Sequence, residues 1–216
     1  MNLRTFKDLL NEQAIAKPGS WKPHVDFSAI KSANLVRLKY EYKGTIKSKS
    51  GMSLDVWLLK NNLFFITGFF DVEEIPTKSG IEEQEYFYIV NALQFNRAKT
   101  YERLFDVKKL LTAEGVITRE EYQGDDISRN LYKFVVNTLN YTILSDSVQY
   151  FGARRLWSIL SNEIDTIVDV VDYKEKKVLK TNVEIHHGKL DHEFDNEYYS
   201  REESKVNIRF ILKKIK

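Results

Sequence analysis

A group of histidines and aspartates near the C-terminal end has the chemistry of a metal site. Three of the four histidines lie within ten residues, together with two aspartates: His186, His187, Asp191, His192 and Asp195. Imidazole nitrogens and carboxylate oxygens are ligands for zinc and other divalent cations. The group lacks the HExxH spacing or a similar ligand pattern. We therefore predict a polar loop here, and no metal site.

Two other groups of charged residues have the chemistry to act on or bind nucleic acid. Asp169, Asp172 and Lys174 lie at one strand end, but no Asp…Glu-x-Lys set follows, so we do not expect a nuclease. A basic strip beside aromatic residues could be formed by Lys108, Lys109, Arg154, Arg155 and the terminal KKIK. The whole chain carries 33 basic and 31 acidic residues, a net charge of +2. This balance favours a solvated face, and nucleic acid is not an expected partner.

The composition limits the class of protein. The 216 residues are 43% hydrophobic and 30% charged, which is enough apolar material for a core and excludes wholesale disorder. The absence of cysteine excludes disulfides, thiolate metal sites and cysteine nucleophiles, and suits a reducing cytoplasm. The apolar run LFFITGFF at 63–70 is far shorter than the roughly 20 residues of a membrane span. The N-terminus MNLRTFKDLLNEQA lacks the features of a signal peptide. We predict a cytoplasmic protein with no membrane association.

The first half of the chain contains patterns typical of one helix and several strands. Leu3, Phe6, Leu9 and Leu10 share a helical face, which predicts an N-terminal helix that ends before Pro18-Gly19. From 34 to 96 the apolar period is two, with turn residues at 50–51, 60–62 and 78–80. We predict four antiparallel strands in a meander, at 35–42, 54–59, 63–72 and 86–95.

The second half alternates between helical and strand patterns. Apolar residues three and four apart predict helices at 101–113, 126–139 and 149–160. Short apolar runs predict strands at 115–121, 141–144, 164–171, 177–183 and 206–212, with a polar loop at 184–204. We predict a single domain over 1–216: an N-terminal helix and loop (1–24), a β-meander (34–97) and a βαβαβ region with a C-terminal strand (115–216). This order predicts an α/β or α+β domain with a mixed sheet.

Residues 116–171 resemble the acetyl-CoA-binding half of the GNAT N-acetyltransferase superfamily. The resemblance is carried by a strand and turn, the run QGDDIS at 123–128, a helix, the strand TILSD and the helix QYFGARRLWSIL. It is greatest to tailed-phage members with an "LY…SD…Q…G…LW" series, here Leu131, Tyr132, Ser145, Asp146, Gln149, Gly152, Leu156 and Trp157. It implies a GNAT-like fold: a mixed, mostly antiparallel sheet flanked by helices, with the N-terminal helix appended.

The resemblance also implies a cofactor site at the start of the helix near Ile127. GNAT enzymes bind pyrophosphate with backbone amides through an [Arg/Gln]-x-x-Gly-x-[Gly/Ala] pattern, and a helix N-terminus suits an anion. The implied cofactor-binding residues are Gln123, Gly124, Asp126, Ile127, Ser128 and Ser145. Gln123 matches the pattern, but Asp126 and Ser128 replace the two small residues. A register starting at Arg119 recovers half of the pattern, with Tyr122 and Gly124 at the two glycine positions.

The two aspartates at this position make cofactor binding unfavourable. Asp125 and Asp126 can accept hydrogen bonds from the free amides at the start of a helix, which stabilises it by about 1 kcal/mol. They also repel a pyrophosphate: one like-charge contact at about 4 Å costs about 4 kcal/mol at a surface-like dielectric. We therefore predict that no cofactor binds. Acetyl-CoA is the cofactor only under the enzyme alternative.

The resemblance implies catalytic groups of two kinds. An acetyltransferase needs an acid for the leaving thiolate, often a tyrosine on the second helix, and a base for the amine. Tyr150 is the candidate acid, and Glu121, next to Glu120, is the candidate base. Both residue types are common in this chain, which has 12 tyrosines.

Two functions stay open at this point. The favoured hypothesis is a phage-type GNAT-like protein with a degraded acetyl-CoA site, which acts non-enzymatically as a virion, assembly or inhibitor protein through protein–protein contacts. The alternative is an active acyl-CoA-dependent N-acetyltransferase on an amine substrate. The site residues, more than the fold, must decide between them.

Overall fold

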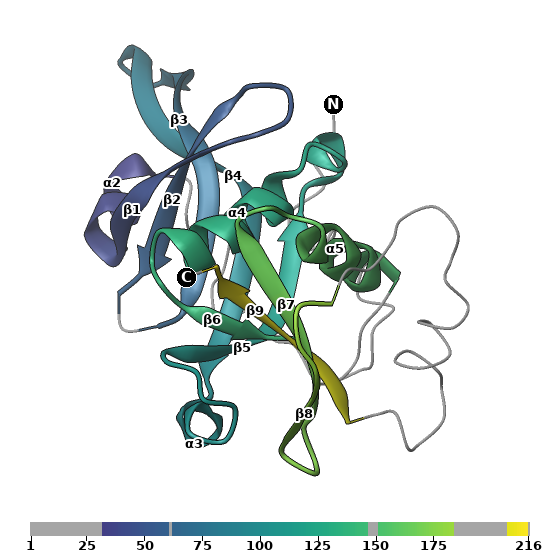
Figure 1. Cartoon of the computed structure of the whole chain (residues 1–216). Coiled ribbons are helices and arrows are strands. Elements are labelled where there is room, and N and C mark those ends of the chain that lie inside the picture. The colour runs from purple at the N-terminus through teal and green to yellow at the C-terminus, as the bar shows by residue number, and fades with distance from the viewer. Residues whose placement is uncertain (1–31, 61, 147–150, 184–206, 216) are drawn as a thin grey trace. The chain divides into compact units, whose positions relative to one another are not determined.

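Nine β-strands make up most of the structure, a computed structural model that describes residues 32–60, 62–146, 151–183 and 207–215 (Figure 1). The strands are β1 (Tyr40–Lys47), β2 (Ser53–Leu59), β3 (Phe64–Thr77), β4 (Gly80–Arg97), β5 (Leu110–Thr118), β6 (Thr142–Leu144), β7 (Thr166–Asp172), β8 (Lys177–Lys180) and β9 (Ile208–Lys214). Their hydrogen-bonded order is β1-β2-β3-β4-β5-β6-β9-β7-β8. The α-helices of the described residues are short: α2 (Ala33–Lys39), α3 (Lys99–Glu102), α4 (Ile127–Asn137) and α5 (Phe151–Ser161), with one 3₁₀ turn, η2 (Glu120–Tyr122).

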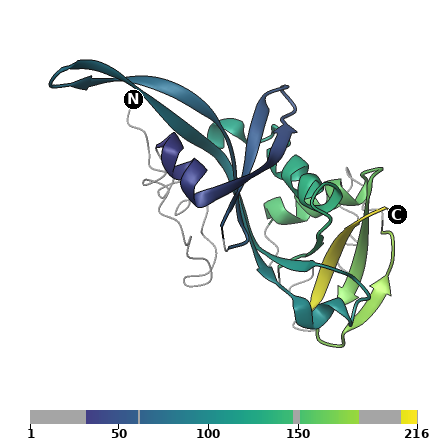
Figure 2. The ribbon, with the colours of Figure 1, turned by 90° about the vertical axis from the view of Figure 1, so that its left-hand side faces the viewer.

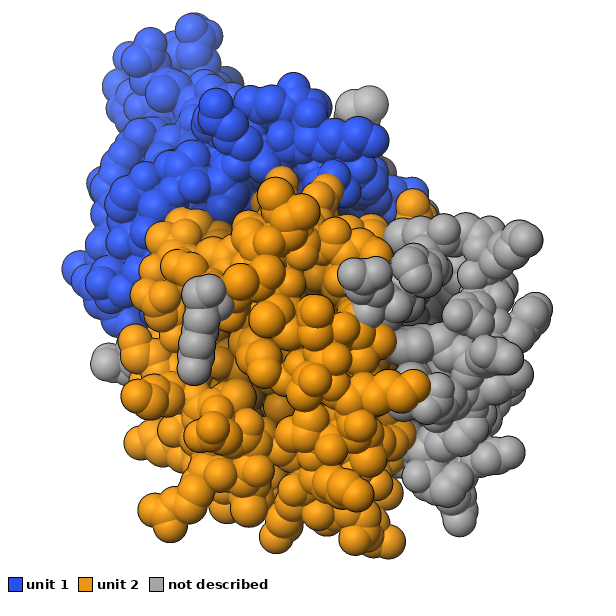
Figure 3. All heavy atoms as spheres, viewed as in Figure 1, with its two compact units in different colours: residues 1–94, 115–128 blue, residues 95–114, 129–216 orange. Residues whose placement is uncertain are grey.

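The chain divides into two compact units, coloured separately in Figure 3. Unit 1 comprises residues 1–94 and 115–128, and unit 2 comprises residues 95–114 and 129–216. Strands β4 and β5 each contribute residues to both units. The single domain over 1–216 stays a prediction.

Unit 1 contains the predicted antiparallel meander. Strands β1 to β4 pair in sequence order, each antiparallel to the next, which confirms this prediction. The first strand differs at its start, because residues 33–39 form α2. Val36 is buried while Leu38 is 68% exposed, so the apolar side chains here follow a helical spacing rather than the predicted alternation.

An aromatic and aliphatic core holds the meander together. Its fully buried members come from α2 and from strands β1, β3, β4 and β5: Val36, Tyr40, Phe64, Ile66, Phe87, Ile89, Ala92 and Ile117. Trp57 and Phe70 pack against this core, with ring centroids 5.8 Å apart in an edge-to-face arrangement. Phe70 and Phe87 are 4.9 Å apart and lie opposite each other across β3 and β4.

Beyond this core, β3 and β4 are longer than the sequence pattern predicts. β3 runs to Thr77 and β4 begins at Gly80, so the two strands also pair over the charged segment between the predicted strands 63–72 and 86–95. We call residues 71–86 the arm. Figure 2 shows this end of the β3–β4 hairpin extending away from the rest of unit 1.

Unit 2 is built around the C-terminal strands. β5 and β6 are parallel, so the connection between them crosses over and contains α4. β9 pairs antiparallel with β6 on one side and with β7 on the other, and β8 follows β7. Trp157 of α5 stacks on Phe210 of β9 with centroids 5.8 Å apart, which packs this helix on the sheet. The predicted helices near α4 and α5 and the predicted strands near β6, β7 and β9 are confirmed.

The predicted GNAT-like fold is wrong. The structure is mostly a nine-stranded mixed sheet with short helices, and it does not support a GNAT-like sheet flanked by helices. One cause is the segment predicted as a helix at 101–113. Only Tyr101 and Glu102, the end of α3, are helical there, and β5 starts at Leu110. The left-handed φ angles of Asp106 and Lys109, 49° and 52°, are incompatible with a helix that continues to 113. The predicted N-terminal helix lies outside the described residues.

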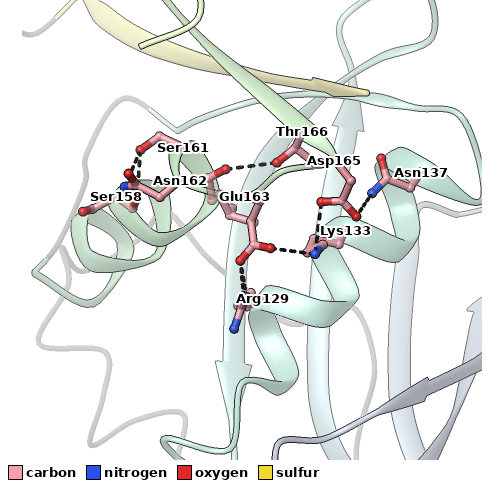
Figure 4. Close-up of polar contacts among 10 residues, drawn as sticks. Arg129, Lys133, Asn137, Ser158, Ser161, Asn162, Glu163, Asp165 and Thr166 are labelled. Carbon is pink, nitrogen blue, oxygen red and sulfur yellow. Dashed lines mark hydrogen bonds and ion pairs between the residues drawn. The ribbon is translucent and has the colours of Figure 1, made fainter. Parts of the chain in front are cut away.

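A network of ion pairs joins α4 to the turn between α5 and β7 (Figure 4). The carboxylate of Glu163 is 8% exposed and accepts hydrogen bonds from Arg129 and, at 2.7 Å, from Lys133. Lys133 also contacts Asp165 at 3.0 Å. Burial lowers the pKa of Lys133, but its hydrogen bonds to Glu163 and Asp165 outweigh burial and raise it. Because the charges of these four side chains cancel, we interpret the network as structural.

None of the helices that the structure describes is long and apolar enough to cross a bilayer.

Gly68 is required by the close approach of β3 and β4. A Cβ atom built on Gly68 would lie 1.8 Å from the carbonyl oxygen of Tyr88, which is backbone and cannot rotate away. Gly68→Ala should therefore lower the free energy of unfolding by about 3 kcal/mol or more, because the two strands must separate. Urea denaturation measures this change.

Gly51→Ala is the matched control. Nothing lies within 4 Å of a Cβ there, and only its φ of +90° is strained, so the loss should be about 1 kcal/mol. Equal losses in the two variants would contradict the steric explanation.

Candidate functional site

The predicted cofactor loop is held onto the β1–β2 turn of unit 1 by Asp125. Its carboxylate accepts hydrogen bonds from the backbone N–H of Ser50 at 2.6 Å and from Ser50 Oγ at 2.7 Å. The Asp125 carbonyl accepts a further bond from Lys49 N at 3.0 Å. The hydrogen bond from the Ser50 side chain is the main cause of a lowered pKa of Asp125. This aspartate therefore fixes the loop to a neighbouring turn.

The other predicted cofactor residues also serve the tertiary structure. Ser128 Oγ is bound to Asn91 Nδ2 at 2.9 Å and to Thr118 Oγ1 at 2.9 Å, and Ile127 is a core residue, 2% exposed. Gln123 is exposed, and its Nε2 donates to the Thr118 carbonyl at 3.5 Å. Gly124 and Asp126 turn the chain with φ angles of 86° and 57°.

Ser145, the last predicted cofactor residue, belongs to unit 2. It is fully buried, and its Oγ accepts a bond from Phe210 N at 3.0 Å while its own N–H donates to the Phe210 carbonyl at 2.8 Å. It thus pairs the end of β6 with β9. The structure brings Gln123 to Ser128 together as one loop in unit 1, whereas Ser145 has a structural role in unit 2.

The predicted catalytic residues are not brought together among the residues that the structure describes. Glu121 is exposed and lies 3.7 Å from Arg119, and its neighbour Glu120 starts η2 at the surface. Tyr150 lies outside the described residues, as does the histidine group at 186–195. Among the residues that the structure does describe, no group of three or more His, Asp or Glu side chains is placed to hold a metal ion.

A basic pocket of about 450 Å³ lies within unit 2, where β4 ends and β5 begins. It is lined by Arg97, Lys99, Glu102, Lys108, Lys109, Leu110, Leu111 and Tyr141. Four of these side chains are cations and one is an anion. A volume of this size is in the usual range for small-molecule sites, about 300–1,000 Å³.

The four cations lie in or beside the connection between β4 and β5. Ala98 N donates to the Leu110 carbonyl at 2.9 Å, so the two strands meet at the base of this connection. Glu102 Oε1 accepts from Leu110 N at 2.9 Å, which fixes α3 above the start of β5. The left-handed backbone at Asp106 and Lys109 then returns the chain to the sheet.

The sequence pattern indicated only two of the four cations in this pocket. Lys108 and Lys109 were predicted to be part of a solvated basic face, together with Arg154, Arg155 and the terminal KKIK. Arg97 and Lys99 were missed because the segment after them was predicted to be a helix, which would have carried them away from Lys108. Had residues 98–109 been predicted as a short connection between two strands, Arg97 and Lys99 would have been placed near Lys108 and Lys109.

A buried arginine is a second unusual feature of unit 2. Arg209 is 9% exposed, and its Nη1 has no hydrogen-bond partner among the described residues. Its guanidinium lies over the ring of Tyr173 at 5.1 Å, and Tyr173 stacks on Tyr101 at 4.4 Å. Burial lowers the pKa of Arg209 and raises that of Tyr173 to about 12, so the phenol is neutral at physiological pH.

Comparison with known proteins identifies no matching family model, no matching curated protein and no matching solved structure. Function must therefore be argued from these features alone.

The bond between Asp125 and Ser50 predicts a pH-dependent contribution to stability. Because the pKa of Asp125 is lowered in the folded state, its contribution is present above the ordinary carboxyl pKa of 3.8 and is lost as the pH falls through the folded value. Asp125→Asn should therefore melt at a lower temperature than the wild type at pH 7. The difference should shrink towards zero as the pH is lowered below 4.

Thermal denaturation followed by circular dichroism between pH 3 and pH 7 measures this effect. Asp106→Asn is a control at an exposed aspartate of the β4–β5 connection. A difference between Asp125→Asn and wild type that stays constant with pH would show that the charge of Asp125 is not involved.

Proposed function

We propose that this chain is a non-enzymatic protein that acts through protein–protein contacts, as a virion, assembly or inhibitor protein does. The arm of unit 1 is its contact surface. The observation that carries the proposal is the exposure of the arm on both faces of its strands, with a net acidic surface.

The arm has no core of its own. Its residues are exposed or half-buried throughout, from Asp71 to Tyr86, while the strand residues just before it belong to the core of unit 1. An isolated two-stranded hairpin is at best marginally stable in water. A long hairpin that buries neither face is therefore suited to stabilisation by a partner, because binding would cover surface that folding leaves exposed.

Six carboxylates and one lysine give the arm its charge: Asp71, Glu73, Glu74, Glu82, Glu83 and Glu85, with Lys78 at the tip. Glu74 and Glu83 lie directly opposite each other across the two strands. Like charges in such a pair destabilise a sheet by roughly 0.2–1 kcal/mol. A basic partner surface would neutralise them, and it is the kind of partner that this arrangement favours.

One face of the arm combines these acids with apolar side chains. Opposite residues of an antiparallel pair share a face, and side chains alternate along each strand. The Glu74–Glu83 pair therefore shares its face with Val72 and Ile81, which are 54% and 71% exposed. A matching partner would present cations flanked by apolar groups, which supply both charge complementarity and buried apolar area.

The base of the arm is anchored to α2, whereas the rest of the arm lacks a core. Glu85 forms two hydrogen bonds with Arg37 of α2, at 2.5 and 2.8 Å. The Arg37 guanidinium also lies 4.4 Å from the ring centroid of Phe70, at the edge of the core. Anchoring of this kind lowers the conformational entropy lost on binding.

The state of the predicted cofactor loop supports the non-enzymatic proposal. Asp125 ties this loop to Ser50, and the hydroxyl of Ser128 is bound to Asn91 and Thr118. These contacts hold a carboxylate in the loop whose backbone amides a pyrophosphate would need, and its negative charge would repel that ligand. Among the residues that the structure describes, no observation favours the enzyme alternative.

A labelled peptide of alternating lysine and leucine tests the proposal, because it presents the expected basic and apolar chemistry. Glu74→Gln/Glu83→Gln should weaken its binding by about 10-fold, through the loss of two favourable charge contacts. The same variant should be more stable than the wild type, since the repulsion between the two carboxylates is removed. Fluorescence anisotropy at low salt measures binding, and thermal denaturation measures stability.

Glu114→Gln/Glu175→Gln is the matched control, because it removes the same charge from β5 and from the β7–β8 turn. It should bind the peptide as the wild type does. If both double variants lose affinity equally, the peptide responds to net charge alone and the arm is not the contact surface.

A further inference from the structure

The basic pocket of unit 2 carries an inference that goes beyond the proposed function. We propose that it is a binding site for a small molecule that bears a polyphosphate group on an organic ring, of the class of a nucleoside triphosphate. This site is separate from the arm and does not depend on it.

The charges of the pocket are not compensated. Among the described residues, Arg97, Lys99, Lys108 and Lys109 form no ion pair, although they line one cavity of about 450 Å³. The carboxylate in the lining, Glu102, accepts a hydrogen bond from the backbone of Leu110 at 2.9 Å. A polyphosphate would supply the missing negative charge, and lysine and arginine are its usual protein partners.

The backbone holds two of these lysines in place despite its own strain. Lys109 has a φ of 52°, a conformation that costs a residue with a side chain of the order of 1 kcal/mol. Its carbonyl accepts a hydrogen bond from Thr142 N at 3.2 Å, next to the start of the parallel β5–β6 pairing. Lys108 and Lys109 are therefore presented from a fixed connection at the edge of the pocket.

Tyr141 is the lining residue that suits an organic group. Leu110 and Leu111 also line the pocket, but each is only 1% exposed and offers a ligand little apolar surface. The ring of Tyr141 lies 5.7 Å from the ammonium of Lys109. An aromatic ring next to cations is a combination that binds a base by stacking and a phosphate by charge.

A small molecule fits these observations better than a nucleic acid. The cations gather around a concave site, whereas a strand of nucleic acid needs an extended basic groove. The net charge of the chain is only +2, so it lacks the global field of a typical nucleic-acid-binding protein.

Isothermal titration at low salt with ATP, inorganic tripolyphosphate and adenosine tests the proposal. The wild type should bind ATP and tripolyphosphate, and it should bind adenosine far more weakly. Lys108→Glu/Lys109→Glu should lower the affinity for both phosphates by at least 10-fold. Tyr141→Ser should weaken binding of ATP but leave that of tripolyphosphate unchanged, because only ATP carries a ring.

Lys174→Glu/Lys177→Glu is the matched control, since it reverses two exposed charges elsewhere in unit 2. It should bind both phosphates as the wild type does, and circular dichroism should show that every variant is folded. If Lys108→Glu/Lys109→Glu is not folded, Arg97→Gln/Lys99→Gln replaces it with the same expected loss.

Three results would overturn the proposal. One is the absence of wild-type binding to ATP and tripolyphosphate up to 1 mM. Another is equal affinity in the wild type and the pocket variant. The third is an equal loss in the pocket variant and the Lys174/Lys177 control, which would show an effect of net charge. None of these results bears on the arm, so they leave the proposed function to its own test.

Discussion

The contact between β3 and β4 at Gly68 is the constraint on which unit 1 depends. The register of the two strands shifts here: Thr67 lies opposite Asn91, whereas Gly68 lies opposite Ile89, so Val90 is an extra residue in β4. A bulge of this kind bends the strand and redirects its side chains. The carbonyl of Val90 accepts a hydrogen bond from Arg119 N, and the side chain of Asn91 reaches Thr118 and Ser128. The same irregularity thus holds the loop before α4 and marks the point beyond which the hairpin leaves the core.

Near-neutral total charge hides two regions of opposite sign. The arm of unit 1 concentrates six carboxylates, and the pocket of unit 2 concentrates four cations around Glu102. Each group has an energetic cost. In the arm, like charges lie opposite each other across a strand pair, and at the pocket Lys109 has a left-handed backbone. Selection for stability alone would remove such arrangements, so we interpret both as binding surfaces.

Local patterns predicted the elements that are held by the core. The helix at 127–137 shows helical periodicity, and the strands at 142–144 and 166–172 are short apolar runs that are buried almost throughout. The arm was not predicted, because its few apolar residues do not alternate with the acids, and Pro76 and Gly80 are typical of a loop. The helix predicted at 101–113 failed because Leu104 lies in the connection after α3 and is 41% exposed, whereas Leu110 starts β5. That error also separated Arg97 and Lys99 from Lys108 and Lys109. The loop that resembles an acetyltransferase cofactor site is instead bound to neighbouring side chains.

Hydrogen–deuterium exchange along the β3–β4 hairpin tests most directly whether the arm is a surface awaiting a partner. The amides of residues 64–69 and 87–94 should exchange slowly, because they belong to the core of unit 1. Those of residues 71–86 should exchange fast in the free protein and become protected when the lysine–leucine peptide is added. An arm that is as protected as the core in the free protein, or that gains no protection at saturating peptide, would contradict this account.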